Sequence, residues 1–155
     1  FAFDERTEEN LRSLRKEVRP AFRRFTAAAQ ALVAAHGLDY IMISGLRSFA
    51  EQSALYAKGR TAPGAIVTNA RAGFSNHNFG DAGDYGVFRD GKYLDADEPK
   101  TAARVHEMVG ALADDHGLSW GGNWKRFKDL PHFEFRSNLT MAEKRAKVKS
   151  GEWAV

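Results

Sequence analysis

The stretch Ser75-Asn76-His77-Asn78-Phe79-Gly80-Asp81-Ala82-Gly83-Asp84 places an imidazole and a carboxylate in one short, glycine-bearing segment. Its two glycines disfavour a helix, so His77 and Asp84 do not simply share a helical face. We expect a turn followed by a short strand, on which Asp84, Ala82 and Gly86 point to one side. A histidine and an aspartate in this setting predict two of the three protein ligands of a catalytic zinc site.

A second polar stretch, Asp129-Leu130-Pro131-His132-Phe133-Glu134-Phe135, supplies a candidate third ligand. Pro131 restricts the approach to His132, and two phenylalanines alternate with Glu134 as in a strand. His132 is the predicted ligand and Asp129 the predicted general base. Glu134 remains an alternative base, or an acceptor that orients His132 from the same side of the strand.

The other three histidines are predicted to be structural. His36 and His116 each precede a Gly-Leu pair at the expected end of a helix, where the helix dipole favours a cation. His106 lies among apolar residues of a predicted helix, and we expect it at the surface or at the boundary of the core. Because the chain has no cysteine, a metal site in it must use histidine and carboxylate.

The two stretches together resemble the M15 family of zinc peptidases. The pattern Ser-x-His-x-x-Gly-x-Ala-x-Asp is filled at every fixed position, and Asp-x-x-His follows it later in the chain. The resemblance extends from about residue 3 to 135 and is closest to the endolysin-like branch. Gly121-Gly122-Asn123-Trp124 and Asp129-Leu130-Pro131-His132-Phe133 carry that closer match.

The resemblance implies hydrolysis of an amide bond with one zinc ion held by His77, Asp84 and His132. It also implies that Asp129 accepts the proton of the attacking water and returns it to the leaving amine. The family match ranks Asp129 above Glu134 as the base.

Three more residues are expected at the site. Arg47 lies where a predicted strand ends, just before a helix that Ser48 and Glu51 cap, and the family resemblance implies that it stabilises the oxyanion. Gln52 matches a glutamine that contacts substrate in the family. Ser75 is expected to position substrate or to orient His77. For Arg47, pairing with Glu51 at the surface is the alternative.

Two positions depart from the family pattern. Asp81 and Gly83 stand where relatives usually carry apolar or bulky residues. This departure predicts a turn that is more flexible or more acidic than in the family.

The resemblance also implies the substrate class, which is the stem peptide of bacterial peptidoglycan. The endolysin-like match favours an L-alanyl-D-glutamate endopeptidase, with a D-Ala-D-Ala carboxypeptidase as the alternative. A catalytically inactive cell-wall-binding module of the same Hedgehog-like fold is the alternative from another class. Action on the cell wall, in the periplasm or outside the cell, follows from either enzyme, although no signal peptide is visible in the sequence.

Composition fits one soluble globular domain. The 155 residues are 43% hydrophobic and 28% charged, with a net charge of +3, and no apolar run is long enough for a transmembrane helix. The basic charge is spread along the chain without an aromatic-interleaved basic stretch, so nucleic-acid binding has no support. We expect a monomer that does not insert into membranes.

The predicted fold is α+β, a small and mainly antiparallel sheet with helices on one side and the zinc cleft at its open face. Residues 1–155 are expected to form a single peptidase domain without a separate wall-binding domain, and 136–155 a helical tail. Predicted helices cover residues 7–14, 20–36, 48–59, 99–115 and 140–151, and predicted strands cover 40–44, 84–88, 92–94 and 118–120. The basic residues around the first two helices are expected to form a solvated face.

Overall fold

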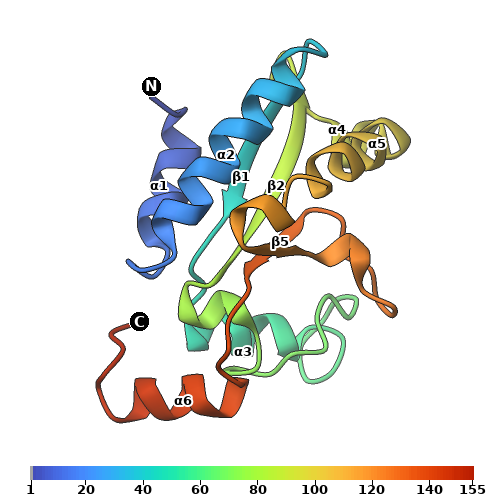
Figure 1. Cartoon of the computed structure of the whole chain (residues 1–155). Coiled ribbons are helices and arrows are strands. Elements are labelled where there is room, and N and C mark those ends of the chain that lie inside the picture. Colours follow the sequence, from blue (N-terminus) through green and yellow to red (C-terminus); the bar gives the residue numbers. More distant parts are fainter. Residues whose placement is uncertain (1) are drawn as a thin grey trace.

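The computed structural model describes residues 2–155 as a small antiparallel sheet with helices around it (Figure 1). The helices are α1 (Glu5–Ser13), α2 (Arg19–Ala34), α3 (Phe49–Ala57), α4 (Leu94–Asp97), α5 (Pro99–Gly110) and α6 (Met141–Lys149). The strands are β1 (Asp39–Ser44), β2 (Ala82–Arg89), β3 (Lys92–Tyr93), β4 (Leu118–Trp120) and β5 (His132–Phe135). Short 3₁₀ helices are η1 (Asn76–Phe79), η2 (Asp114–His116) and η3 (Gly121–Asn123).

The sheet has the order β1-β2-β5-β4, with β3 paired to β2, and every strand pair is antiparallel. Strands β2 and β3 are joined by the two-residue turn Asp90-Gly91, in which both residues have positive φ, a conformation that an Asp-Gly pair favours. In the pairing of β2 with β5, Asp84 lies directly opposite His132. Directly paired residues present their side chains on the same face, so this register alone brings a carboxylate and an imidazole together.

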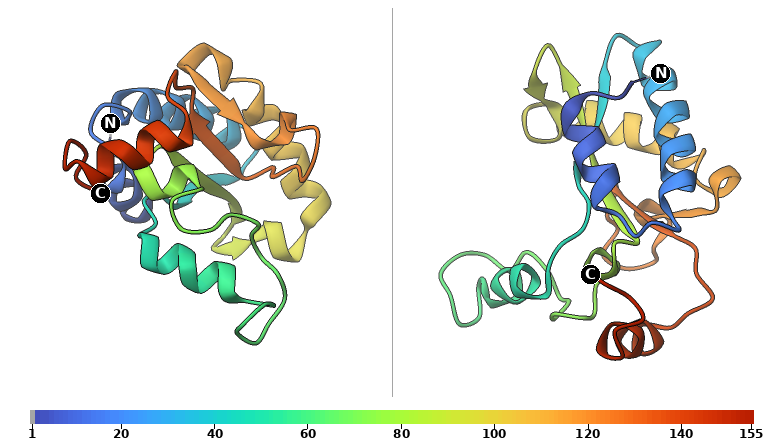
Figure 2. Two further views of the ribbon diagram at one scale, coloured as in Figure 1. Left: turned by 90° about the horizontal axis from the view of Figure 1, so that it is seen from below. Right: turned by 90° about the vertical axis from the view of Figure 1, so that its left-hand side faces the viewer.

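Helices cover one face of the sheet, as predicted. Tyr40, Met42, Tyr85 and Val87 point from β1 and β2 into a core that α1, α2 and α5 close. Tyr40 stacks on Tyr85 with ring centroids 5.1 Å apart, and such burial of large aromatic side chains dominates the stability of a small domain. Helices α3 and α6 lie apart from this layer, at the end of the sheet where β2 begins (Figures 1 and 2). The opposite face of β2 and β5 therefore stays open beside Asp84.

Local sequence signals explain several element boundaries. Asp4 caps α1, and Ser48 with Glu51 forms the predicted capping box of α3. Thr140 with Glu143 forms a second capping box, at the start of α6. The long segment 60–74 has no helix or strand of the sheet, as expected from its composition.

The predicted helix 99–115 is shorter than expected. Helix α5 ends at Gly110, and the 3₁₀ helix η2 follows it. Gly110 packs so closely on Trp120 that a Cβ there would lie 2.4 Å from the indole. The helix therefore ends against a side chain of β4 that local sequence does not reveal.

The prediction that His106 lies at the surface or core boundary is wrong. Its side chain is buried, with Nδ1 2.7 Å from the Tyr40 hydroxyl and Nε2 2.6 Å from Asp95 Oδ2. Both ring nitrogens thus have partners from other elements, and these hydrogen bonds offset the free-energy cost of burying the imidazole. None of the helices within residues 2–155 is long and apolar enough to cross a membrane.

Candidate metal centre

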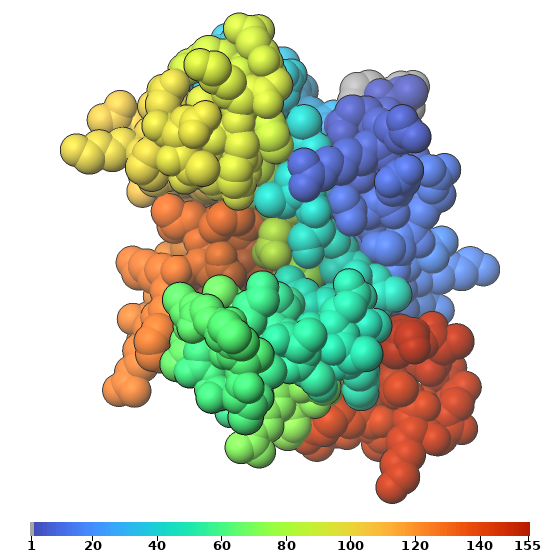
Figure 3. Space-filling model, turned by 180° about the vertical axis from the view of Figure 1, so that it is seen from behind, coloured from blue at the N-terminus to red at the C-terminus, as the bar shows by residue number. Residues whose placement is uncertain are grey.

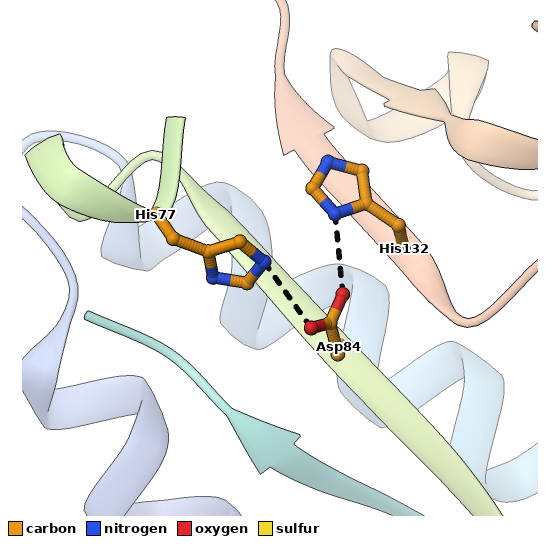
Figure 4. A group of neighbouring side chains, drawn as sticks. All are labelled: His77, Asp84 and His132. Atoms are coloured by element: carbon orange, nitrogen blue, oxygen red, sulfur yellow. Dashed lines mark hydrogen bonds and ion pairs between the residues drawn. The ribbon is translucent and has the colours of Figure 1, made fainter. Parts of the chain in front are cut away.

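Two segments far apart in the sequence bring His77, Asp84 and His132 together (Figure 4). One potential ligand atom from each of the three lies within 4.8 Å of the other two. The Asp84 carboxylate lies between the rings, with Oδ2 3.2 Å from His77 Nε2 and Oδ1 3.1 Å from His132 Nδ1. Two imidazole nitrogens and one carboxylate oxygen are the donor set of a catalytic zinc site.

The 3₁₀ turn η1 positions His77. Ser75 caps this turn, since its Oγ accepts a hydrogen bond of 3.3 Å from the backbone N–H of His77. Gly80 ends it with a φ of +70°, where a Cβ would lie 2.5 Å from the backbone nitrogen of Arg15. The segment is thus a turn followed by a strand, as predicted, although the turn is a 3₁₀ helix and the strand is eight residues long.

A backbone carbonyl fixes the orientation of the His77 ring. Nδ1 lies 2.8 Å from the carbonyl oxygen of Gly45, which only accepts hydrogen bonds. Nδ1 therefore carries a proton that it donates to Gly45, and Nε2 is the ring nitrogen that faces Asp84. A metal-binding histidine typically donates its second ring N–H in this way. No residue type signals this partner, because Gly45 acts through its backbone.

A carboxylate fixes the orientation of His132. Nε2 lies 2.8 Å from Glu134 Oε1, so that Nδ1 faces Asp84. Glu134 in turn accepts a hydrogen bond of 2.9 Å from the Asn76 side-chain amide. This geometry favours the alternative in which Glu134 orients His132 over the one in which it is the base.

The close contacts in this cluster shift the pKa values of Asp84 and His132 in opposite directions. Burial raises the pKa of Asp84, but hydrogen bonds from His132 and His77 outweigh burial and hold that pKa well below its usual range. Burial lowers the pKa of His132, but Asp84 and Glu134 outweigh it and raise that pKa to about 9. A metal ion replaces the proton that His132 holds on Nδ1, so metal binding to this cluster releases a proton.

Asp129 lies near these side chains without being one of the three clustered ligands. It sits in a turn that Gly121 closes, with the backbone N–H of Asp129 donating to the Gly121 carbonyl at 3.1 Å. A Cβ on Gly121 would lie 2.3 Å from the Asp129 carbonyl oxygen, so only glycine permits this approach. Burial and the nearby Asp84 charge raise the pKa of Asp129, which the imidazoles of His132 and His77 partly offset. A carboxyl with a raised pKa is suited to accept a proton.

Arg47 points toward the cluster, with Nη2 3.9 Å from Asp84 Oδ2. Gln52 holds it there by accepting a hydrogen bond of 3.0 Å from Nη1, while the Gln52 amide donates to the Ala70 carbonyl at 2.7 Å. Gln52 is fully buried and both ends of its amide are occupied. This favours a role in positioning Arg47 over the predicted direct contact with substrate.

The turn at Asp81 is tightly held, which contradicts the prediction that it is more flexible than in the family. Asp81 is fully buried, and its two oxygens pair with Arg15 at 2.8 Å and Lys144 at 2.7 Å. Arg15 is therefore not part of a solvated basic face. A Cβ on Gly83 would lie 2.2 Å from the methyl at the end of the Met42 side chain, which would have to move to admit it. Both departures from the family pattern are thus accommodated by partners from distant elements.

The molecular surface is hollowed on the side of the sheet that the core helices leave open (Figure 3). The hollow lies between the orange segment around residues 120–130 and the teal and green segments around residues 45–75, with yellow-green atoms of β2 at its floor (Figure 3). Asp84 keeps 22% of its side chain exposed, so the cluster is accessible from solvent.

Comparison with known proteins identifies the family of the chain. A family described as D-alanyl-D-alanine carboxypeptidase, of the M15 peptidases, matches residues 68–135. The peptidoglycan L-alanyl-D-glutamate endopeptidase CwlK of Bacillus subtilis is 39% identical over 126 residues, which cover 79% of this chain and 75% of CwlK. The chain therefore belongs to the M15 family of zinc peptidases, as the two motifs predicted.

Solved structures with the same fold include both kinds of peptidase in this family. The L-Ala D-Glu endopeptidase ChiX of Serratia marcescens has a TM-score of 0.55 and 27% identity, over 86% of this chain and 88% of ChiX. The vancomycin-resistance D,D-pentapeptidase VanY, solved with Zn(II), has a TM-score of 0.54 and 15% identity, over 89% of this chain and 79% of VanY. These likenesses confirm the predicted fold.

Proposed function

We propose that this chain is a zinc-dependent peptidoglycan hydrolase that cuts the L-alanyl-D-glutamate bond of the stem peptide. The observation that carries the proposal is the convergence of His77, Asp84 and His132 with Asp84 partly exposed to solvent and Asp129 close by. CwlK and ChiX, which are both named as endopeptidases for this bond, support the choice of substrate.

The ligand set we assign is His77 through Nε2, His132 through Nδ1 and Asp84 through its carboxylate. The ligand set fits zinc because the ring nitrogen of each histidine that faces the cluster can offer a lone pair to a metal ion once His132 is neutral. When bound, zinc polarises the scissile carbonyl and favours ionisation of a water molecule. Both imidazoles are tied at their far nitrogens, so the site is arranged before the ion binds.

Asp129 is assigned as the general base and then the general acid. Its carboxylate accepts a proton from the water that attacks the carbonyl carbon and later donates this proton to the leaving amine. The raised pKa of Asp129 reduces the free-energy gap between its two protonation states near neutral pH, which suits both steps.

Arg47 is assigned to the developing negative charge on the carbonyl oxygen. Its guanidinium is held by Gln52 and still has donors that face the hollow beside Asp84. A donor that is fixed before the reaction stabilises the transition state without reorganisation. Ser75 acts by capping the turn that carries His77, and Gln52 acts by fixing Arg47.

The place of action we propose is the bacterial cell wall, in the periplasm or outside the cell. We further propose that residues 1–155 act as one monomeric peptidase domain, in which 136–155 contributes the helical tail. The M15 membership and the names of CwlK and ChiX support the wall as the target.

Digestion of purified peptidoglycan tests the function directly. The zinc-loaded protein should release fragments with a new amino-terminal D-glutamate, and chelation should abolish the release until zinc is restored. Binding to the wall without any new termini would instead identify an inactive wall-binding module.

A D-Ala-D-Ala carboxypeptidase remains the second candidate. The description of the matched family and the likeness to VanY favour it. The same digestion separates the two activities, because a carboxypeptidase releases free D-alanine and leaves the L-alanyl-D-glutamate bond intact.

A further inference from the structure

Helix α6 has an unusual anchor for a helix that packs on a domain. Its fully buried side chain is Lys144, which is 2% exposed, whereas its apolar residues are not fully buried. A lysine is rarely buried unless its charge is paired, and Lys144 pairs with the fully buried Asp81. Figure 1 shows α6 in red at the end of the sheet, apart from the core helices.

The buried ammonium also donates a second hydrogen bond that leads to the metal centre. Lys144 Nζ lies 2.7 Å from Asn76 Oδ1, and Asn76 Nδ2 donates to Glu134 Oε2 at 2.9 Å. Glu134 Oε1 accepts from His132 Nε2 at 2.8 Å. One continuous series of hydrogen bonds thus connects α6 with a candidate zinc ligand.

Each link in this series has only one possible direction. An ammonium only donates, so Asn76 must present its carbonyl oxygen to Lys144 and its NH₂ group to Glu134. The Glu134 carboxylate only accepts, so His132 must carry a proton on Nε2. The remaining nitrogen, Nδ1, is the one that faces Asp84. Lys144 therefore fixes the orientation of the Asn76 amide, and this amide holds the Glu134 carboxylate that contacts Nε2 of His132.

We propose that Lys144 is a positioning residue of the metal centre, which acts through Asn76 and Glu134 to fix the His132 ring for zinc. The proposal rests on the function proposed above for this site. It extends that function to the C-terminal helix, which lies outside the residues 68–135 that match the family.

Stability alone does not account for a lysine at this position. Taking two charges out of water opposes their attraction, so a buried ion pair often contributes no more than apolar residues of similar size. Asp81 would also keep a partner without Lys144, because Arg15 binds its other oxygen at 2.8 Å. An apolar residue could replace neither the hydrogen bond to Asp81 nor the one to Asn76, but only the bond to Asn76 leads on to His132.

The substitution Lys144→Met tests this role by removing the donor while keeping a long side chain. Zinc affinity, measured by competition with a chelator and without substrate, should fall about 10-fold, the lower end for partners of metal ligands. A crystal structure of the variant should show the Asn76 side chain turned away from Glu134 and the His132 ring displaced from its wild-type position. Lys147→Met is the matched control, because Lys147 lies on the same helix and pairs with Glu152 at the surface.

A double-mutant cycle with Asn76→Leu separates positioning from general loosening. If Lys144 acts through Asn76, the double variant should bind zinc about as weakly as Asn76→Leu alone. If Lys144→Met does not fold, the paired change Asp81→Leu with Lys144→Met removes both charges together and allows the same measurement. Wild-type zinc affinity with Asn76 and His132 in their wild-type positions in a folded variant, or additive losses in the cycle, would overturn the proposal.

These readouts also separate this proposal from the proposed activity. A wild-type protein that binds zinc but leaves peptidoglycan intact contradicts the activity and not the role of Lys144. If the wild type cleaves peptidoglycan but Lys144→Met leaves the zinc affinity unchanged, the role of Lys144 is contradicted and the activity is not.

Discussion

The two imidazoles of the metal centre are oriented by different means. The protein backbone holds His77, through the Gly45 carbonyl. Side chains hold His132, through Glu134, Asn76 and finally Lys144 on α6. A backbone partner survives almost any substitution, whereas a series of side chains can be changed at every link. The His132 half of the site is therefore the half through which mutation can tune zinc binding.

Loss of either imidazole has the largest expected effect, and this effect should be the same for His77 and His132. His77→Ala and His132→Ala should each abolish zinc binding at micromolar metal and reduce peptidoglycan cleavage to background, because two protein ligands cannot hold the ion in a defined geometry. Metal analysis of the purified proteins beside the digestion assay measures both quantities. His36→Ala is the matched control, because this histidine is exposed and far along the chain from the cluster. Full activity in either ligand variant would contradict the assigned site.

Asp129→Asn should separate catalysis from metal binding. The change keeps the size of the side chain and removes the proton acceptor, so the rate should fall by about 10²–10⁴-fold while zinc stays bound. The turnover number, together with the zinc content of the same sample, checks this expectation. A variant that also loses zinc would show that Asp129 belongs to the ligand set.

The sequence predicted the chemistry of the site better than it predicted what holds the site in place. His77, Asp84 and His132 were found because the residue types and their spacing are local signals. Gly45 could not be found, since a backbone carbonyl leaves no trace in the residue type. Lys144 is one of several basic residues in the C-terminal helix, and its residue type does not distinguish it from the others.

Burial was the other property that local patterns did not reveal. His106 was placed at the surface or boundary because its partners, Tyr40 and Asp95, come from other elements. Asp81 was interpreted as making the turn more acidic or more flexible, whereas Arg15 and Lys144 neutralise it from opposite ends of the chain. Pairing over such separations is decided by the fold, which explains why the elements were easier to predict than their contacts.

Arg47→Met should have the next largest effect and should act on the rate more than on zinc. Loss of one fixed donor to a developing oxyanion lowers the rate by about 10²–10³-fold in comparable sites. Arg47→Lys keeps the charge but not the forked geometry that Gln52 holds, so it should recover only part of the activity. Turnover numbers of both variants at saturating substrate make the comparison, and equal rates for Arg47→Met and the wild type would exclude the assigned role.

Metal removal should lower the stability of the folded chain by a smaller amount. Zinc at about 100 times its dissociation constant stabilises a protein that binds it only when folded by about 2.7 kcal/mol. For a chain of 155 residues, this corresponds to a rise in melting temperature of roughly 5–10 °C. Thermal unfolding with zinc and with chelator measures the shift. The shift should vanish in both histidine variants, and a shift that persists in either would place the ion elsewhere.

The smallest effect in this series, Glu134→Gln, is also the sharpest test of the difference between the two imidazoles. The glutamine oxygen can still accept from His132 Nε2, but the amide has no charge. Its NH₂ group would then face the NH₂ group of Asn76, and two donors cannot form a hydrogen bond with each other. Zinc affinity should fall about 10-fold.

The His77 ring should be unaffected, because its partner is the Gly45 carbonyl. Nitrogen NMR of the two rings separates these outcomes within one sample. If His77 and His132 change alike, the two halves are coupled through Asp84, and the distinction between a backbone-held and a side-chain-held ligand has no consequence for binding.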